Sequence, residues 1–366
     1  MAVNQLFAGL TANSPPTAKS APIYRLVPVP TATADRIDRR PMPQMSPLQT
    51  SALPQTMTAA RINHPGPPEI IAFGAVAVPE PQELEVLVRI AAAGVGPWDA
   101  LVRTGKSGLP VSPPLTLGAE ISGVVEKVGA NTGGFAAGDE VFGGTNALFV
   151  NGYAEYAVVS ARMIAKKPPA LSHLEAAALP VVGVMAWQML FDHAAVREGQ
   201  TVLVHGGAGN VGAYAVQLAH TRKLHVIATV RNGDAAYVKS LGADEVINTE
   251  TANLADLVRR ADAVIDTVGG ALQDQLFDMV KPGGIVVSSV SRPNPQLAQR
   301  RRVRADYFIV DVNTTQLTRL ADMRAAKDLI IPVGSVLPLA EARAAHEMLA
   351  GTRARKRGKI VLNVAG

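Results

Sequence analysis

The stretch from Thr201 to Gly212 constrains the fold of this chain more than any other. A short apolar strand runs into a turn with four glycines in seven residues, and a segment of helical character follows over 213–220. A second apolar strand follows over 225–230. A strand, a glycine-rich turn, a helix and a second strand in this order predict a parallel βαβ unit.

The glycines of this turn indicate where phosphates would bind. Gly207 is expected to adopt the positive φ of a tight turn, and Gly209, without a Cβ, lets a pyrophosphate approach the backbone. Gly212 lets the helix lie close to the strand, and the first N–H groups of the helix attract anions. The predicted pyrophosphate-binding residues are Gly207, Ala208, Gly209, Asn210, Val211 and Gly212.

The end of the second strand indicates which dinucleotide would bind. NAD-binding units of this kind usually carry an acid there, which holds the ribose 2′-hydroxyl. Here Thr229, Arg231 and Asn232 occupy this end, and no acid is present. A guanidinium pairs well with a phosphate. These three residues therefore predict NADP(H), with a solvated arginine on an ordinary turn as the alternative.

The composition fits a globular protein of about two domains. The 366 residues are 48% hydrophobic and 18% charged, and the absence of cysteine excludes disulfides and thiolate metal sites. The most apolar run, 176–191, is shorter than the ~20 residues needed to cross a membrane. Because the N-terminus also lacks a secretion signal, we expect a cytoplasmic protein that does not enter a membrane.

The net charge of +5 is concentrated in two basic clusters. They comprise Arg300, Arg301, Arg302 and Arg304, and Arg353, Arg355, Lys356, Arg357 and Lys359. Aromatic residues make up 4% of the chain, and none lies within the clusters to stack on bases. Solvated basic faces are therefore favoured over nucleic-acid binding.

Residues 1–56 differ from the rest of the chain. Prolines recur there without any sustained apolar period, which predicts a disordered or loosely docked leader. Its scarcity of acids fits an organelle transit peptide, and a translation start placed upstream of Met57 would look the same. The second interpretation is favoured because no strongly amphipathic arginine face is present.

The remaining chain predicts an α/β fold with two domains. Short strands with glycine turns over 57–176 indicate a β-barrel-like domain. Strands and helices then alternate, including helices over 183–191 and 252–259 and a strand over 307–312, which indicates a parallel, doubly wound sheet over 177–330. The last elements, in 331–366, are too few for a domain and are expected to rejoin the first.

Nine motifs carry a resemblance to a known superfamily. They are residues 94–99, 117–120, 138–142, 152–156, 179–187, 205–212, 241–244, 266–270 and 358–361. Through them the chain resembles the medium-chain dehydrogenase/reductase superfamily, on its zinc-free quinone oxidoreductase (zeta-crystallin-like) branch. The resemblance implies a GroES-like β-barrel catalytic domain, a Rossmann NADP(H)-binding domain, and a homodimer joined through an edge strand near 307–312.

The residues at the superfamily's metal positions argue against a metal. Zinc alcohol dehydrogenases of this superfamily bind zinc through a cysteine, a histidine and a further cysteine or acid. The first two positions correspond here to Gly96 and Ala119, which are not metal ligands. His205, before the glycine turn, is interpreted as a packing residue. Without Lewis-acid activation, we expect a small-molecule acceptor that is already electrophilic, such as a quinone or an activated alkene.

The resemblance also implies an apolar substrate pocket. Relatives often carry Asn at the position of Gly96, Tyr or Lys at Leu101 and Thr at Met185. Trp98, Leu101 and Met185 are the substrate-pocket candidates, with a core position as the alternative for Trp98. No general acid is evident, so catalysis would rest on placement beside the cofactor, with a proton from water or a ribose hydroxyl.

Further cofactor candidates lie near the ends of later strands. Thr267 and Val268 follow the fourth strand of the alternating unit, at the edge where ligands bind, with simple packing as the alternative. By resemblance, Ser288 to Val290 line the nicotinamide. Lys359 matches a position near the cofactor, and solvent exposure is equally compatible with its sequence context.

Two carboxylates close to the pocket have structural interpretations. Asp99 is interpreted as the cap of a short helix rather than as a base. Glu120, beside the lost metal position, is interpreted as a hydrogen-bonded structural carboxylate rather than as a proton donor.

The sequence supports one function most strongly, an NADPH-dependent reductase of quinones or α,β-unsaturated carbonyls. A non-catalytic NADPH-binding sensor or structural protein is the second hypothesis, because the usual polar groups are missing at Gly96, Leu101 and Met185. A metal-free alcohol dehydrogenase is the third.

Overall fold

The computed structural model describes residues 53–252 and 260–365. Nearly all of the predicted leader, 1–56, and nearly all of the predicted helix over 252–259 lie outside the described residues. The first strand begins at Thr56, one residue before the expected boundary. In the described parts of the chain, no helix is both long and apolar enough to cross a bilayer.

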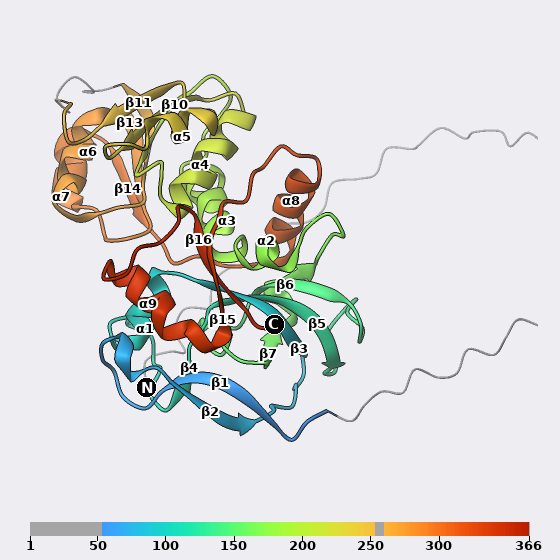
Figure 1. The fold of residues 1–366 in the computed structure, drawn as a ribbon. Coiled ribbons are helices and arrows are strands. Elements are labelled where there is room, and N and C mark those ends of the chain that lie inside the picture. Colours follow the sequence, from blue (N-terminus) through green and yellow to red (C-terminus); the bar gives the residue numbers. More distant parts are fainter. Residues whose placement is uncertain (1–52, 253–259, 366) are drawn as a thin grey trace, which may run out of the picture. The chain divides into compact units, whose positions relative to one another are not determined.

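Six parallel strands form the predicted doubly wound sheet, in the order β11-β10-β9-β12-β13-β14 (Figure 1). Their bounds are β9 Thr201–His205, β10 His225–Val230, β11 Glu245–Asn248, β12 Ala261–Asp266, β13 Val280–Ser288 and β14 Arg304–Tyr307. The strand order reverses between β9 and β12, and ligands of open α/β sheets bind at such a reversal.

Helices cover both faces of this sheet because its strands are apolar on both faces. Val202 and Val204 of β9 pack in one core cluster with the helices α3 and α4, whereas Leu203 packs in another with α6 and α7. The helices are α3 Pro180–Trp187, α4 Asn210–Thr221, α5 Ala235–Ser240, α6 Gln273–Met279, α7 Pro295–Arg301 and α8 Thr314–Ala325.

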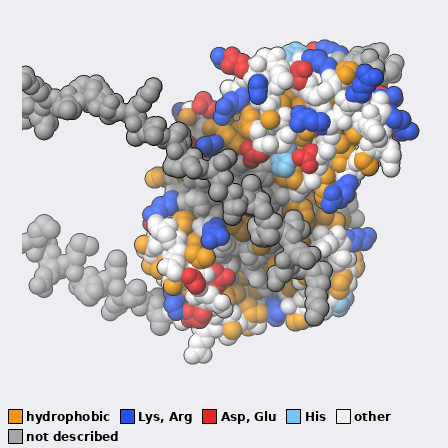
Figure 2. Space-filling model, turned by 180° about the vertical axis from the view of Figure 1, so that it is seen from behind, with side chains coloured by type: hydrophobic (Ala, Val, Ile, Leu, Met, Phe, Trp, Pro, Cys, Tyr) orange, Lys and Arg blue, Asp and Glu red, His pale blue; other side chains and the backbone are white. Residues whose placement is uncertain are grey.

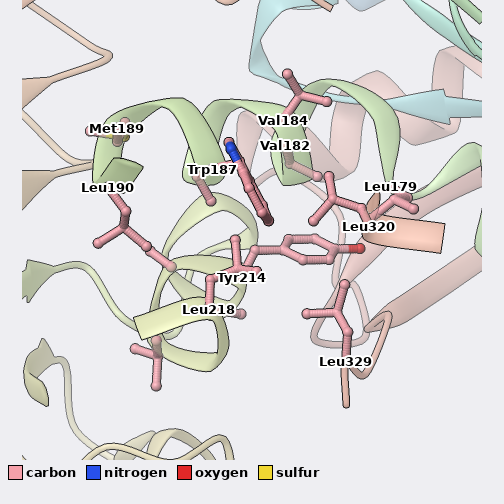
Figure 3. Close-up of a cluster of buried hydrophobic side chains, with 14 of the residues drawn as sticks. Leu179, Val182, Val184, Trp187, Met189, Leu190, Tyr214, Leu218, Leu320 and Leu329 are labelled. Atoms are coloured by element: carbon pink, nitrogen blue, oxygen red, sulfur yellow. The ribbon is translucent and has the colours of Figure 1, made fainter. Parts of the chain in front are cut away.

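Figure 3 shows the core between α3, α4 and α8. The ring of Tyr214 lies among apolar side chains of these helices, and its hydroxyl donates to the carbonyl of Ala178 at 3.2 Å. The prediction that the helix α3 begins at Gly183 is wrong. It begins at Pro180, since proline suits a first helical turn where no N–H is needed, and it ends at Trp187, followed by a wider turn over Gln188–His193.

Two further sheets form the β-rich part of the chain. One is a seven-stranded sheet with the path β15-β16-β3-β5-β6-β8, in which β7 also pairs with β3; the other has the order β2-β1-β4. The strands are β1 Thr56–Ile62, β2 Ala72–Ala77, β3 Glu85–Val95, β4 Leu115–Thr116, β5 Glu120–Val128, β6 Glu140–Gly144, β7 Tyr156–Ser160, β8 Ile164–Lys166, β15 Val333–Pro338 and β16 Lys359–Asn363. The helices here are α1 Pro97–Arg103, α2 His173–Ala177 and α9 Ala342–Ala350.

The last strand returns to the first part of the chain. β16 pairs antiparallel with β3 over Ile360–Asn363, so two segments nearly 270 residues apart share one sheet. We therefore propose that residues 57–176 and 331–366 form one domain and residues 177–330 the other.

The predicted strand over 307–312 is wrong in most of its length. β14 ends at Tyr307. Beyond it, the backbone N–H of Asp311 donates to the side chain of Gln188 at 3.1 Å, and the Gln188 amide donates back to the Asp311 carbonyl at 2.7 Å. Side-chain partners thus replace a strand ladder there, and β14, over Arg304–Tyr307, is the last strand in the order of the parallel sheet.

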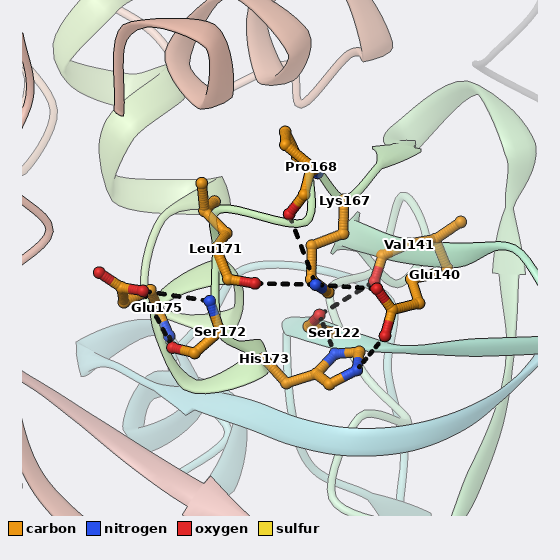
Figure 4. A network of polar contacts seen from close by, with 9 residues as sticks. All are labelled: Ser122, Glu140, Val141, Lys167, Pro168, Leu171, Ser172, His173 and Glu175. Atoms are coloured by element: carbon orange, nitrogen blue, oxygen red, sulfur yellow. Dashed lines mark hydrogen bonds and ion pairs between the residues drawn. The ribbon is translucent and has the colours of Figure 1, made fainter. Parts of the chain in front are cut away.

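A fully hydrogen-bonded polar cluster, here called the anchor cluster, joins β5, β6 and α2 (Figure 4). It comprises Ser122, Glu140, Lys167 and His173. The Lys167 ammonium pairs with Glu140 at 2.9 Å and donates to the Leu171 carbonyl at 2.8 Å. His173 contacts Ser122 at 2.8 Å and Glu140 at 3.3 Å through its two ring nitrogens. The cluster holds the start of α2 against the barrel sheet.

Acids accompany several residues of the basic clusters. Arg301 pairs with Asp278, and Arg353 lies 3.9 Å from both Glu341 and Glu347. Figure 2 shows one face of the molecule, on which acidic side chains are interspersed among the Lys and Arg side chains. The clusters are therefore neutralised in part, as expected of solvated charged faces.

Candidate functional site

The glycine turn has the geometry of a tight approach between a strand and a helix. Gly206, not Gly207 as predicted, takes the positive φ, at 85°. A Cβ on Gly212 would lie 2.1 Å from the carbonyl oxygen of Gly206, so only glycine fits there. Gly209 is exposed at the start of α4, and the nearest atom to a Cβ there would be 3.3 Å away. The exposed backbone at Gly209 leaves room for an anion at the helix start.

His205 and Thr229 fasten this turn to the next strand. The Thr229 hydroxyl contacts Nδ1 of His205 at 2.7 Å and accepts from the Gly206 N–H at 3.1 Å. Both side chains are buried. The predicted role of Thr229 beside Arg231 at a phosphate stays a prediction. Thr229 sets the shape of the turn, and His205 is a packing residue as the sequence suggested.

Arg231 lies on an exposed turn at the end of β10. The Asp234 N–H donates to the Arg231 carbonyl at 3.3 Å, which closes the turn, and Arg357 pairs with the Asp234 carboxylate. The backbone N–H of Asn232 donates to Glu250 at 3.4 Å. Arg231 and Asn232 are both exposed, so they remain available to a ligand, with one carboxylate, Glu250, close by.

A cavity of about 260 Å³ lies between the carboxyl edge of the parallel sheet and the barrel. The predicted residues that line it are Trp98, Leu101, Met185, Val211, Thr267, Val290 and Lys359. The wall also includes Phe149 and the segment Phe308–Val310, which the sequence had indicated as strand. In this segment Val310 is buried and Ile309 is 52% exposed. An apolar run alone cannot distinguish a strand from a stretch that lines a cavity.

Two predicted cofactor residues do not face this cavity. Ser288 is fully buried, and its hydroxyl donates to the Asp266 carboxylate at 2.9 Å. Asp266 also accepts from the Gly269 N–H at 2.8 Å and from Gln273 at 3.0 Å. Ser288 thus belongs to the support of the strand ends, and its neighbour Ser289 lines the cavity instead. Val268 is 46% exposed and lies against Gly206 rather than in the cavity wall.

Lys359 is not solvated. It is 2% exposed and forms an ion pair with Glu120, which is equally buried. Glu120 also accepts from the N–H of Val181 at 2.8 Å, so β5, β16 and the start of α3 meet at this carboxylate. The interpretation of Glu120 as a structural carboxylate therefore holds, and both residues of the pair line the cavity.

Asp99 caps α1, as the sequence predicted, and it also lines the cavity. Its Oδ2 accepts from the Gly96 N–H at 2.8 Å. Burial raises the pKa of Asp99 to about 6, against the lowering effects of the Gly96 hydrogen bond and of Lys359. A carboxyl of this pKa beside a cavity can hold a proton near neutral pH.

Sequence reasoning missed two buried residues near Asp99. The Tyr153 hydroxyl lowers the pKa of Asp99, and the Tyr153 ring lies 6.0 Å from the ring of His346. Nδ1 of His346 accepts from Arg103 at 3.1 Å. No spacing in the sequence connects these residues, because 243 positions separate Arg103 from His346.

The site does not fit a catalytic metal. Gly96 and Ala119 stand in the cavity wall where the superfamily's zinc ligands would be. Across the described residues, no three His, Cys, Asp or Glu side chains lie close enough together to hold a metal ion.

A parallel sheet with a glycine turn at its strand reversal is typical of dinucleotide-binding domains, and the relatives place this chain among the oxidoreductases. The family comparisons give the same class. Residues 82–169 match the alcohol dehydrogenase GroES-like domain, and residues 241–362 match the family described as zinc-binding dehydrogenase. The chain belongs to the medium-chain dehydrogenase/reductase superfamily, on its quinone oxidoreductase branch.

Individual relatives support this placement. The human quinone oxidoreductase is 30% identical over 324 residues, which cover 84% of this chain and 97% of the relative. A 2-methylene-furan-3-one reductase of Solanum lycopersicum is 40% identical over 221 residues, covering 58% of this chain and 56% of the relative. The solved quinone oxidoreductase of Coxiella burnetii superposes with a TM-score of 0.79 at 32% identity, covering 84% of this chain and 99% of that one.

Proposed function

We propose that the protein is a zinc-independent NADPH-dependent reductase that transfers hydride to a quinone or an α,β-unsaturated carbonyl. The single observation that carries the proposal is the apolar cavity at the carboxyl edge of the parallel sheet, which adjoins the start of α4 and has no metal-ligand set in its wall. A relative named as a quinone oxidoreductase and one named as an enone reductase support the two acceptor classes.

The residues present fit a nicotinamide dinucleotide. The N–H groups of the first turn of α4, from Asn210 to Gly212, would hold its pyrophosphate, with the exposed backbone of Gly209 leaving room for it, and Arg231 with Asn232 would hold a 2′-phosphate. Thr267 and Val290 would flank its nicotinamide end. When bound, such a cofactor supplies a hydride.

The cavity wall selects the acceptor by its apolar character. Trp98 and Phe149 are in edge-to-face contact with ring centroids 5.8 Å apart, and Leu101, Met185 and Phe308 complete an apolar lining. Flat unsaturated molecules gain from contact with such aromatic walls. Contact with this lining would hold the acceptor beside the hydride donor.

The second candidate is an NADPH-binding sensor or structural protein without turnover. The apolar residues Leu101 and Met185 favour it, because polar groups that assist the reaction in relatives are missing there. Oxidation of NADPH in the presence of a panel of quinones and enones separates the two candidates. We expect turnover with at least one class, and tight NADPH binding without any turnover would favour the sensor.

Arg231 tests the choice of cofactor. Hydrogen bonds to charged groups contribute ~1.5–3 kcal/mol, so Arg231→Ala should weaken NADPH binding about tenfold or more and leave NADH binding unchanged. Glu250→Gln is the matched control, because removal of that nearby carboxylate should strengthen NADPH binding. Isothermal titration of both cofactors checks this, and an equal loss for NADH would contradict the assignment.

A further inference from the structure

In the described structure, unpartnered polar atoms occur on two residues of the cavity wall, Trp98 and Asp99, and on two buried residues near Asp99, Tyr153 and His346. Within the described residues, six buried side-chain polar atoms have no hydrogen-bond partner. Four of them belong to Trp98, Asp99, Tyr153 and His346. Buried polar atoms are rarely left unpaired, because each costs roughly 1–3 kcal/mol, so such a concentration requires an explanation.

Three of these atoms have complementary hydrogen-bonding character. Because Arg103 donates to Nδ1 of His346, the proton of this neutral imidazole lies on Nε2, which is therefore a donor. The Tyr153 hydroxyl both donates and accepts, and the free oxygen of Asp99, Oδ1, accepts when ionised. His346 therefore supplies a donor, Tyr153 a group of either character, and Asp99 an acceptor.

We propose that Asp99 is the proton donor of the reaction and that Tyr153, oriented by His346, is its positioning residue. The proposal rests on the reductase function proposed above and adds to it the acid that the sequence did not reveal. Asp99 suits this role because it lines the cavity, is 2% exposed and uses only Oδ2 as the helix cap.

The step balances without any further co-reactant. The β-carbon of an enone gains a hydride from the cofactor, and the electrons of the C=C bond move towards the carbonyl to give an enolate. The Oδ1–H bond of Asp99 then breaks, and the α-carbon of the enolate takes the proton. With a quinone, the phenolate oxygen takes it. The carboxylate left behind regains a proton from water after the product leaves.

The surroundings of Asp99 set its proton affinity. Burial and the Glu120 carboxylate raise its pKa, whereas the Gly96 N–H, Lys359 and the Tyr153 hydroxyl lower it, with a result of about 6. About one tenth of such a group is protonated at pH 7. General acids work best when their pKa lies near the working pH, and removal of the Tyr153 hydroxyl should raise this pKa.

Asp99→Asn in the full-length protein tests the proposal, because asparagine can still accept from the Gly96 N–H but cannot supply the proton. With NADPH and 2-methylcyclohex-2-enone in D₂O, we expect the wild type to deuterate the α-carbon on one face. Asp99→Asn should lower kcat by ~10²–10⁴, lose this facial selectivity, and lose the fall in rate above pH ~6 that the wild type should show.

Tyr153→Phe should keep the facial selectivity and shift the pH at which the rate falls to a higher value. A purely structural residue would not change this pH. Asp139→Asn is the matched control, since Asp139 caps a turn in the same way by accepting from the Ala136 N–H at 2.9 Å, away from the cavity. Unchanged rate, selectivity and pH profile in Asp99→Asn would overturn the proton-donor assignment while leaving the reductase function in place. If the wild type oxidised NADPH with none of the quinones and enones tested, both the reductase function and the proton-donor assignment would be overturned.

Discussion

The anchor cluster, which is partly exposed, and the buried group around Asp99 are two polar sites in the β-rich part of the molecule, and they differ in how completely they are hydrogen-bonded. In the anchor cluster, Ser122, Lys167 and His173 all have partners (Figure 4). Around the cavity, among the described residues, Asp99, Tyr153 and His346 each retain one unpartnered atom.

The difference indicates what each site contributes. A fully paired polar site holds its elements together, and nothing remains for a ligand to bind. A buried site with free donors and acceptors beside a cavity costs stability, and proteins tolerate such costs where chemistry needs them. We therefore expect substitutions in the anchor cluster to change stability alone, and those around Asp99 to change the reaction.

The largest expected effect on stability distinguishes Lys359, which lies in the cavity wall with Asp99, from Lys167 of the anchor cluster. Lys359→Met leaves the Glu120 carboxylate buried and unpaired, which should lower the free energy of unfolding by ~3–5 kcal/mol. Lys167→Met should cost less, ~1–3 kcal/mol, because its partner Glu140 is 45% exposed and can be hydrated. Urea denaturation without cofactor measures both. Equal costs would remove the contrast, and the double variant Glu120→Gln with Lys359→Met should recover part of the loss.

The histidines should differ in their effect on the pH dependence of stability. Burial lowers the pKa of His346 to about 3 from its ordinary value of 6.5. As the pH falls below 6.5, the unfolded chain binds this proton and the folded protein does not, so stability falls by up to ~1.4 kcal/mol per pH unit. His346→Asn should remove this loss between pH 6.5 and 4.

His173 provides the comparison for that experiment. Burial also lowers the pKa of His173, but Glu140 opposes the shift. His173→Asn should therefore change the slope of stability against pH less than His346→Asn does. Unfolding by urea at several pH values checks the ranking, and an unchanged slope in His346→Asn would contradict the assigned burial effect.

The smallest expected effect compares two hydroxyls. Ser122→Ala removes a 3.0 Å hydrogen bond to the Val141 carbonyl as well as the contact with His173, so it should lower the free energy of unfolding by ~1 kcal/mol. Tyr153→Phe removes a buried hydroxyl without a partner in the described structure and should not lower it. Thermal unfolding measures both, and a larger loss in Tyr153→Phe would show that its hydroxyl is bonded after all.

The parts of the fold that could be predicted are those written locally in the sequence. The glycine turn before α4 and the alternation of strands and helices depend on residues close together in the chain, and apolar periods reveal them. The cap formed by Asp99 was predicted for the same reason. The left-handed position fell on Gly206 rather than Gly207, a difference of one residue that turn composition alone does not resolve.

The parts that could not be predicted depend on residues far apart. His346 lies beside Tyr153 and Arg103 only because α9 returns to the barrel, and no sequence pattern indicates that meeting. The apolar character of the segment Phe308–Val310 predicts a strand, although the segment lines the cavity and is not part of a sheet. Burial of Lys359 likewise depends on a partner, Glu120, that lies more than 200 residues earlier.

The central claim is that this cavity transfers hydride to an electrophilic acceptor, and isotope transfer tests it most directly. The protein would be mixed with NADPH deuterated at the nicotinamide C4, on either face, together with a quinone or an enone, and the product analysed by mass spectrometry. We predict one deuterium in the enone product, at its β-carbon, from one of the two labelled cofactors, and oxidation of NADPH with the quinone. Cofactor binding with no deuterium in any product and no NADPH oxidation would contradict the account.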